Sequence, residues 1–404
     1  MSTTSYPDFA PPHRLLLGPG PSMVHPRVLH ALSLPLVGHL DPIFLALMNE
    51  IQALLRETFQ TENEFTIALS GTGSAGMEAV IANLVEPGDR VIVGVNGIFG
   101  TRLATMVDRH GGTALSLEAP WGTTIALDLL QERLSHSGPV KAVVLVHAET
   151  STGTWQPLEE VGSLCQDYDA LLIVDAVTSL GGVPVEVDAW GIDACYSGTQ
   201  KCLSCPPGLA PLTLSPKAVR AIQKRRLPCR SWYLDLSLIA EYWADRTRTY
   251  HHTAPISMLY GLREALRLVH EEGLAARIAR HQMNSHALLA GLHTLGLSSL
   301  PSAGHRLPML NCVTLPDRID DELVRARLLK EYGIEIGGGL GPLRGRVWRI
   351  GLMGESSRQA HVMTLLNALE EIFTCQGWLT HPGLAVQAAD DVYSGSQRSA
   401  RRSA

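Results

Sequence analysis

Two residues of this chain could act together in chemistry on an amino group, Lys201 and Asp175. Lysine is scarce, with five copies against 28 arginines, and Lys201 lies on a polar, Gly-containing loop over 196–201. Asp175 ends the apolar run 171–174, which predicts a short buried strand, and strand ends are where α/β proteins place reactive groups. A carboxylate can hold a pyridinium nitrogen protonated while a lysine forms a Schiff base. The pair therefore predicts pyridoxal 5′-phosphate chemistry.

Such a cofactor also needs a site for its phosphate, and residues 70–76 could form one. Their sequence is SGTGSAG; it follows the apolar run 65–69 and precedes a helical stretch that contains Met77 and Val80. Small residues at a helix start let main-chain N–H groups approach a dianion. Turns of this kind also bind nucleotides or merely turn tightly, so the interpretation depends on the lysine and the aspartate described above.

The elements that must position these groups are short apolar runs that alternate with helical stretches. The runs are 65–69, 90–95, 142–146 and 171–174. This alternation predicts an α/β fold with a mostly parallel sheet covered on both faces. We expect an N-terminal arm over 1–20, a large cofactor-binding domain over 21–270, a small α+β domain over 271–385 and a disordered tail over 386–404. The tail is predicted from its scarcity of large apolar groups.

Composition excludes several classes of protein. The formal net charge of −6 gives no basic surface for nucleic acid. No apolar run reaches the roughly 18 residues of a membrane span, and the first residues do not resemble a signal peptide. These features predict a cytoplasmic enzyme with small-molecule substrates and no membrane or nucleic-acid partner.

Cysteine and histidine patterns predict neither disulfides nor a metal site. Seven cysteines at irregular spacing argue against a disulfide framework. Cys202 and Cys205 form a CxxC without a second ligand pair, so we expect them to pack beside the lysine loop. Adjacent His251 and His252 point to opposite faces of a strand and lack nearby carboxylates, so we expect them at a subunit interface.

Taken in order, the motifs resemble the class V, fold-type I pyridoxal phosphate-dependent aminotransferases of the alanine-glyoxylate and serine-glyoxylate kind. The match runs from Leu15 to about Leu379. Its motifs are LLGPGPS at 16–22, SGTGSAGME at 70–78, HAETSTG at 147–153, VDAVTSLGG at 174–182, SGTQK at 197–201, YHHT at 250–253, GGGLG at 337–341 and WRIG at 348–351.

The resemblance implies a role for each residue of the cofactor site. Lys201 is implied to bind the cofactor covalently and Asp175 to pair with its ring nitrogen. The other implied contacts are Thr72, Gly73, Ser74 and Gln200 at the phosphate, Thr150 at the phenolic oxygen, and Val177 and Phe99 on the two ring faces. Relatives often carry tryptophan where this chain has Phe99. Tyr250 and Thr253 are implied to reach the phosphate of the neighbouring subunit, which makes the active unit a homodimer.

For the substrate, the resemblance points to Arg349 and Gly18. Alternation along 347–350 places Arg349 on the face opposite Trp348 and Ile350, and its planar fork suits a carboxylate bidentately. The turn at Gly18 lacks side chains and keeps the pocket small, which favours small oxo acids.

The implied reaction is ping-pong transfer of the amino group of L-alanine or L-serine to glyoxylate, giving glycine and pyruvate or hydroxypyruvate. Transfer from ureidoglycine to glyoxylate is an alternative within the same class. A class V lyase such as a cysteine desulfurase would need a mobile catalytic cysteine, and Cys312 and Cys375 are the candidates in the smaller domain. A protein that keeps this fold without turnover would lack Lys201 or Asp175, and both are present.

Overall fold

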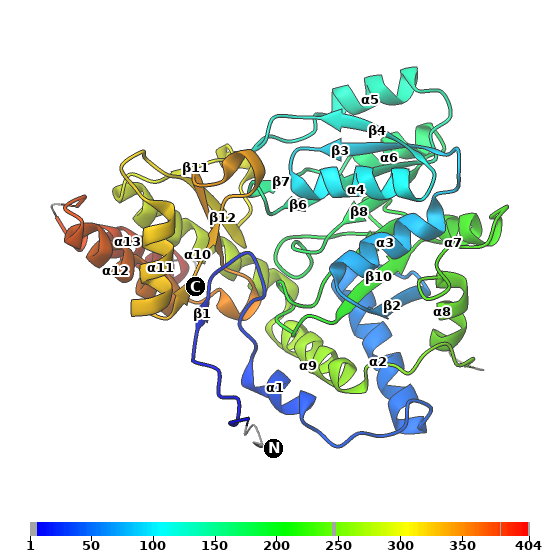
Figure 1. Cartoon of the computed structure of the whole chain (residues 1–404), viewed down its shortest axis with the longest axis horizontal. Helices are drawn as coiled ribbons and strands as arrows, with labels where there is room; N and C mark the ends of the chain where they lie inside the picture. The colour runs from blue at the N-terminus through cyan, green and yellow to red at the C-terminus, as the bar shows by residue number, and fades with distance from the viewer. Residues whose placement is uncertain (1–5, 245–247, 380, 403–404) are drawn as a thin grey trace, which may run out of the picture.

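The chain forms two units, each with its own hydrophobic core, and an N-terminal segment that passes between them (Figure 1). The structure is a computed structural model that describes residues 6–244, 248–379 and 381–402. The larger core contains buried residues from Val28 to Val269, and the smaller one contains Leu17 and buried residues from Ala287 to Tyr393. These two cores support the predicted division near residue 270, which stays a prediction.

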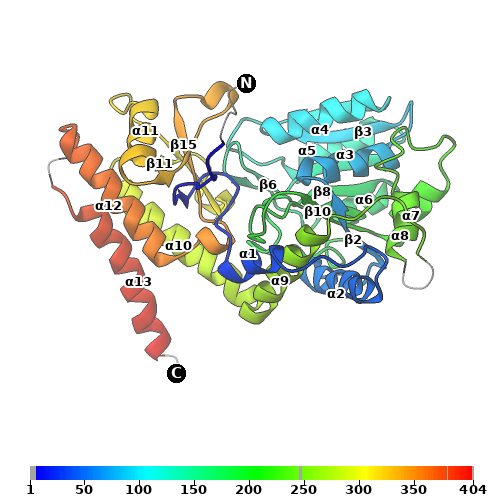
Figure 2. The same ribbon diagram turned by 60° about the horizontal axis from the view of Figure 1, so that its bottom comes forward.

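A seven-stranded sheet forms the centre of the larger unit. In spatial order its strands are β2 (Phe65–Ser70), β10 (Leu209–Leu214), β9 (Ala194–Tyr196), β8 (Leu171–Asp175), β5 (Ala142–Val146), β3 (Arg90–Val95) and β4 (Thr113–Glu118). Strand β10 runs antiparallel to the other six strands, which are parallel to one another. Every residue of β5 and β8 is buried, because helices cover both faces (Figure 2). The predicted mostly parallel α/β fold is confirmed.

The helices of the larger unit are α1 (Pro26–Leu32), α2 (Pro42–Phe59), α3 (Gly73–Leu84), α4 (Ile98–Arg109), α5 (Leu127–His136), α6 (Val161–Asp167), α7 (Pro216–Gln223), α8 (Leu236–Trp243) and α9 (Ile256–Glu272). Several begin as their sequence dictates. Asp41 accepts a hydrogen bond from the N–H of Ile43 at 2.8 Å. Pro42 is the first residue of α2, a position whose N–H would have no partner within the helix. Ser215 caps α7 in the same way. Two short strands, β6 (Ala148–Glu149) and β7 (Thr154–Trp155), form a hairpin after β5.

The smaller unit packs helices against an antiparallel sheet. The strands are β11 (Ser298–Ser299), β12 (Leu310–Thr314), β15 (Val347–Gly351) and β14 (Gly337–Gly338), and the helices are α10 (Leu274–Thr294), α11 (Asp321–Glu331), α12 (Gln359–Cys375) and α13 (Leu384–Arg402). Short 3₁₀ turns lie at Ala303–His305, Gly341–Leu343 and Gly354–Ser356. The N-terminal strand β1 (Leu15–Leu16) pairs with β13 (Ile334–Glu335), so the start of the chain is fastened to this unit.

The predicted disordered tail over 386–404 is wrong for its described part, because 384–402 form helix α13 (Figure 2). Ala385, Ala389 and Tyr393 are buried, and the Tyr393 hydroxyl donates to Asn284 Oδ1 at 2.8 Å. These three residues repeat every four positions and form a narrow stripe that packs on α10. Average composition hides such a stripe, since the polar residues around it face solvent. Residues 403 and 404 lie outside the described part of the chain.

We expect Tyr393→Ala to lower the free energy of unfolding by about 3 kcal/mol, because it removes a buried aromatic ring from the contact between α13 and α10. Urea-induced unfolding followed by circular dichroism measures the change. Tyr6→Ala is the control, since Tyr6 is 87% exposed. Equal stability of the two variants would contradict the packing of α13.

Candidate active site

Asp175 is a buried carboxylate at the carboxyl end of the central strand β8. The Tyr196 hydroxyl donates to its Oδ2 at 2.9 Å, and the N–H of Val177 donates to its Oδ1 at 2.9 Å. Burial raises the pKa of Asp175 to about 6, although both hydrogen bonds oppose the shift. A positively charged N–H donor stabilises a buried carboxylate more than a neutral donor does. Asp175 is therefore a suitable partner for a protonated ring nitrogen.

Lys201 lies on the loop that follows β9, and its amine donates to the carbonyl oxygen of Pro19. Burial lowers the pKa of Lys201 to about 8, and the positive charge of Arg349 acts in the same direction. Gly20 has a φ of +113°, and an added Cβ there would lie 2.7 Å from the lysine Nζ. The backbone conformation favours glycine at this position, and the absence of a Cβ leaves room for the lysine amine.

The main chain of the lysine loop is held by residues from both units. Ser22 Oγ donates to the carbonyl of Lys201 at 2.8 Å. Buried Arg277, on α10, donates to the carbonyl of Cys202 at 2.5 Å and to that of Gly181 at 3.1 Å. Sequence reasoning missed Arg277, because one arginine among 28 carries no signal that it turns inward. Its contact with the residue after the lysine makes it a positioning residue.

The predicted phosphate site is the start of α3. Thr72 is the N-cap residue, and the first helical turn offers main-chain N–H groups. A Cβ on Gly73 would lie 2.9 Å from Val177 Cγ2, so the helix start and the strand end lie in direct contact. Ser74 Oγ lies 3.4 Å from a guanidinium nitrogen of Arg102. These residues fit an anionic group at the helix N-terminus.

Gln200 supplies a second sign that a polar group fits here. Its side-chain oxygen is buried and has no hydrogen-bond partner among the described residues. Rotation of the amide exchanges this oxygen for the nitrogen, which can donate to a phosphate. The main chain of Gln200 is fixed by the N–H of Ser22 at 2.9 Å. The structure therefore brings the start of α3, Val177 and the Gln200 loop into one cradle.

Phe99 is positioned by a carboxylate that caps α4. Buried Glu149 accepts from the N–H of Phe99 at 3.0 Å, and its other oxygen accepts from Ser151 Oγ at 2.5 Å. Burial raises the pKa of Glu149. The Arg102 guanidinium lies 5.0 Å from the centre of the Phe99 ring, a cation–π distance. Buried Thr150 follows Glu149 directly, so this carboxylate lies beside two predicted cofactor contacts.

Arg349 lies on β15 with the predicted alternation. Trp348 and Ile350 belong to the smaller core, while Arg349 faces away, 8% exposed, with Nε donating to the carbonyl of Gly338 at 2.7 Å. Its Nη1 lies 3.5 Å from the carbonyl oxygen of Thr150 in the larger unit. Burial lowers the pKa of Arg349. Gly18 runs beside this strand, because a Cβ on Gly351 would lie 2.0 Å from the Gly18 carbonyl.

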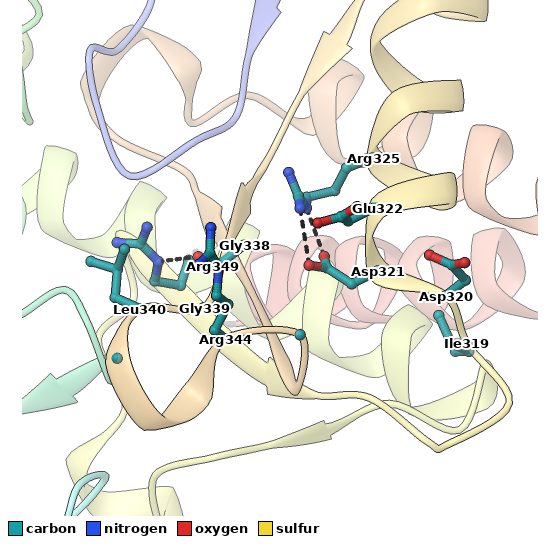
Figure 3. Close-up of a pocket in the computed structure, with 12 residues that line it drawn as sticks. Ile319, Asp320, Asp321, Glu322, Arg325, Gly338, Gly339, Leu340, Arg344 and Arg349 are labelled. Carbon is teal, nitrogen blue, oxygen red and sulfur yellow. Dashed lines mark hydrogen bonds and ion pairs between the residues drawn. The ribbon is translucent and has the colours of Figure 1, made fainter.

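Arg349 also lines a cavity of about 830 Å³ between α11 and the glycine loop after β14 (Figure 3). The loop borders the larger unit, since a Cβ on Gly341 would lie 3.1 Å from Trp121. The Arg349 side chain is therefore reached from this cavity.

Tyr250 and Thr253 lie on a segment that faces outward. Tyr250 is 56% exposed, and its hydroxyl is 3.4 Å from Thr253 Oγ1. Beside them, His252 Nε2 lies 2.7 Å from Ser70 Oγ, and the facing Nδ1 atoms of His251 and His252 are 2.7 Å apart. The two rings face each other on a segment that is not a strand, so the expectation that they point to opposite faces of a strand is wrong. The pair ties this segment to the loop that leads into the phosphate cradle. The predicted contact with a partner's phosphate stays a prediction.

Cys312 is 2% exposed on β12, and burial raises the pKa of its thiol to about 12, so it lacks the properties of a mobile catalytic cysteine. Within residues 6–244, 248–379 and 381–402 no group of three potential metal ligands comes together. No helix in those ranges is long and apolar enough to span a bilayer.

Known proteins resemble this chain over nearly its whole length. The family model Aminotransferase class-V matches residues 19–343. The (S)-ureidoglycine–glyoxylate transaminase of Bacillus subtilis is 42% identical over 96% of this chain and 97% of its own. The alanine–glyoxylate aminotransferase of Mus musculus is 41% identical over 89% of this chain and 87% of its own. A crystal structure of an alanine–glyoxylate aminotransferase from Nostoc sp. superposes with a TM-score of 0.90 at 52% identity, covering 92% of this chain and 98% of that one.

These similarities agree with the geometry of the site. They confirm the predicted fold type, the predicted aminotransferase activity and the predicted pyridoxal phosphate cofactor, to which the Lys201 and Asp175 pair first pointed. By its motifs, its fold and its relatives, the chain belongs to the class V aminotransferases.

Proposed function

We propose that this enzyme transfers the amino group of a small amino acid, L-alanine or L-serine, to glyoxylate. The observation that carries the proposal is a buried arginine, Arg349, whose strand partner Gly337 packs against Pro19, the residue whose carbonyl accepts from the Lys201 amine, beside the glycines Gly18 and Gly20. A guanidinium there can hold the carboxylate of the donor and of the acceptor in turn, while the turn leaves room for a small side chain only. Relatives named for alanine and glyoxylate support this choice.

When bound, pyridoxal phosphate withdraws electrons from the carbon that carries the amino group, so that its C–H bond can ionise. Asp175 would hold a proton on the ring nitrogen. The residues proposed to bind the rest of the cofactor are Thr72, Gly73, Ser74 and Gln200 at the phosphate, Thr150 at the phenolic oxygen, and Val177 and Phe99 on the ring faces.

Lys201 is proposed to move the proton at the substrate carbon. Burial favours its neutral amine, which can accept a proton near neutral pH. Arg349 would orient the substrate through its carboxylate so that the C–H bond faces this amine. Both half-reactions use the same three side chains, Lys201, Asp175 and Arg349, so product must leave before the second substrate binds. Ping-pong kinetics follow.

Ureidoglycine is a second candidate donor. It is supported by the transaminase of Bacillus subtilis named for it, whose crystal structure superposes with a TM-score of 0.94 at 43% identity, covering 96% of this chain and 100% of that one. The cavity beside Arg349 also contains carboxylates and further arginines that could meet an amide-rich side chain. The measured donor preference decides between the two candidates.

The test of this function is a set of initial rates with glyoxylate as the acceptor and L-alanine, L-serine or (S)-ureidoglycine as the donor. We expect L-alanine or L-serine to give the highest kcat/KM, with glycine as product, and Lys201→Ala to abolish turnover. A preference for ureidoglycine would select the second candidate. No transfer to glyoxylate from any of the three donors would overturn both.

The state of the lysine can be measured directly in cofactor-free protein. A small amine-reactive reagent attacks only neutral lysine, so labelling of Lys201, quantified by mass spectrometry, should rise with a midpoint near pH 8 and be lost as the pH falls below it. Arg349→Gln should shift the midpoint upward, because it removes a nearby positive charge. Asp175→Asn should shift it downward. Midpoints unchanged in both variants would contradict this arrangement of charges.

We further propose that the active unit is a homodimer in which Tyr250 and Thr253 complete the partner's phosphate site. Their exposure on the surface supports a role toward a second copy.

A hybrid dimer tests this proposal. Lys201→Ala subunits should be inactive alone, and Tyr250→Ala/Thr253→Ala subunits should be weakly active alone. Their hybrid carries one site with every residue intact if the segment crosses to the partner, so activity should return. A hybrid no more active than its parents would show that each chain completes its own site.

A further inference from the structure

We propose that Asp321 is a positioning residue for Arg349: it fixes the guanidinium through Arg325, Gly338 and Trp348. The inference rests on the proposed function, because it takes Arg349 to bind the substrate carboxylate. Asp321 does not face the cofactor site, and nothing in the sequence motifs points to it.

Asp321 is a buried carboxylate at the first residue of α11, 8% exposed. Its Oδ1 accepts from Arg325 Nε at 2.6 Å and its Oδ2 from Arg325 Nη2 at 2.9 Å, a bidentate pair (Figure 3). Oδ1 also accepts from the indole N–H of Trp348 at 2.9 Å. One carboxylate therefore joins the helix to the strand that carries Arg349. Pairs of this geometry are the strong and directional ones.

The held guanidinium of Arg325 packs against Gly338. A Cβ built on Gly338 would lie 3.2 Å from both Cζ and Nε of Arg325, closer than ordinary contact. The carbonyl of this same glycine accepts from Arg349 Nε at 2.7 Å. A single peptide group thus separates the Asp321–Arg325 pair from the substrate arginine.

Strand β14, here called the glycine strand, has no side chains that could fix its position, so contacts from neighbouring residues must do so. β14 has two residues, Gly337 and Gly338, and glycine has the greatest backbone freedom. Side chains are excluded here: a Cβ on Gly337 would lie 2.6 Å from Pro19, and one on Gly339 would lie 1.9 Å from the Leu343 carbonyl. Arg325 therefore supplies from outside the restraint that the strand lacks.

Trp348 carries the second link. It is fully buried, precedes Arg349 and lies opposite Gly338 in the ladder between β14 and β15. Asp321 thereby restrains both strands that flank the arginine. Supporting contacts of this kind decide how closely a binding group keeps its productive geometry.

Asp321→Asn removes the charge, weakens the bidentate pair and keeps the size of the side chain. Since the carboxylate site serves donor and acceptor alike, we expect KM to rise about tenfold for both the amino donor and glyoxylate. We expect kcat to change less than about twofold, because Lys201 and Asp175 are untouched. The measurement is steady-state kinetics on the cofactor-loaded enzyme. Unchanged KM values for both substrates would overturn the proposal.

Glu331→Gln is the matched control. It breaks another bidentate pair on the same helix, in which Arg327 Nε and Nη2 lie 2.9 and 2.8 Å from Glu331. Neither Arg327 nor Glu331 supplies an atom among those nearest to Gly337, Gly338 and Gly339, so KM should stay at the parent value. An equal rise in KM in the control would attribute the effect to general loosening of α11 and overturn a specific role.

A carboxylate-free substrate separates positioning from structural damage. With ethylamine as the amino donor and no glyoxylate present, Asp321→Asn and the parent enzyme should complete the first half-reaction at equal rates, because no carboxylate then meets Arg349. A parallel loss with ethylamine would count against the proposal. If Asp321→Asn does not fold, Trp348→Phe removes the indole N–H together with part of a buried ring and should raise both KM values in the same direction, while the ethylamine half-reaction keeps the parent rate. Unchanged KM values would overturn the proposal.

Arg349→Gln distinguishes failure of this inference from failure of the proposed function. A rise in KM with Arg349→Gln but not with Asp321→Asn would leave the substrate role of Arg349 intact and remove Asp321 from it. No rise with Arg349→Gln would remove the substrate role itself.

Discussion

Leu17 and the turn from Gly18 to Ser22 that follows it are hydrogen-bonded to both units of the protein, and the geometry of the site depends on these bonds. On one side, Leu17 exchanges main-chain hydrogen bonds with Glu335 and Gly351 of the smaller unit, at 2.9 and 2.8 Å. On the other side, Pro19 accepts from the Lys201 amine, and Ser22 holds the carbonyls of Gln200 and Lys201. A segment without bulky side chains can pass between two cores and still bind each through its backbone.

This arrangement places an amine, a carboxylate and a guanidinium in one desolvated space. Burial moves the pKa of Asp175 up to about 6 and that of Lys201 down to about 8, so each group lies close to the point where it exchanges protons near neutral pH. Arg349 keeps its charge despite burial and contributes to the shift at Lys201. The pKa of each of these groups is therefore set by its surroundings.

The side chains that position the reactive residues also carry charges. Glu149 caps α4 beneath Phe99, Arg277 fastens the carbonyl after Lys201, and Asp321 ties α11 to the strand of Arg349. Each is buried and has several hydrogen-bond partners. Removing one partner from such a cluster leaves a buried charge uncompensated, which costs more than the bond itself returns. Such clusters favour one arrangement of the loops over its alternatives.

The sequence by itself determined those features that depend on a short stretch of residues or on a regular spacing along the chain. Unbroken apolar runs predicted the parallel strands, the SGTGSAG turn predicted a helix start that suits an anion, and the ordered motifs identified Lys201 and Asp175 with the class of reaction. Alternation along 347–350 also predicted correctly that Arg349 faces away from Trp348. These features need only the period of a strand and the conformations that small residues allow.

Tertiary structure alone decided which charged residues turn inward. Arg277 and Asp321 read as ordinary helix positions, and only the packing of α10 and α11 brings them to the lysine loop and the glycine strand. The same holds for α13, where buried Ala385, Ala389 and Tyr393 form a stripe that composition averages away. A contact between residues distant in sequence depends on how whole elements pack, and neither composition nor local spacing encodes that.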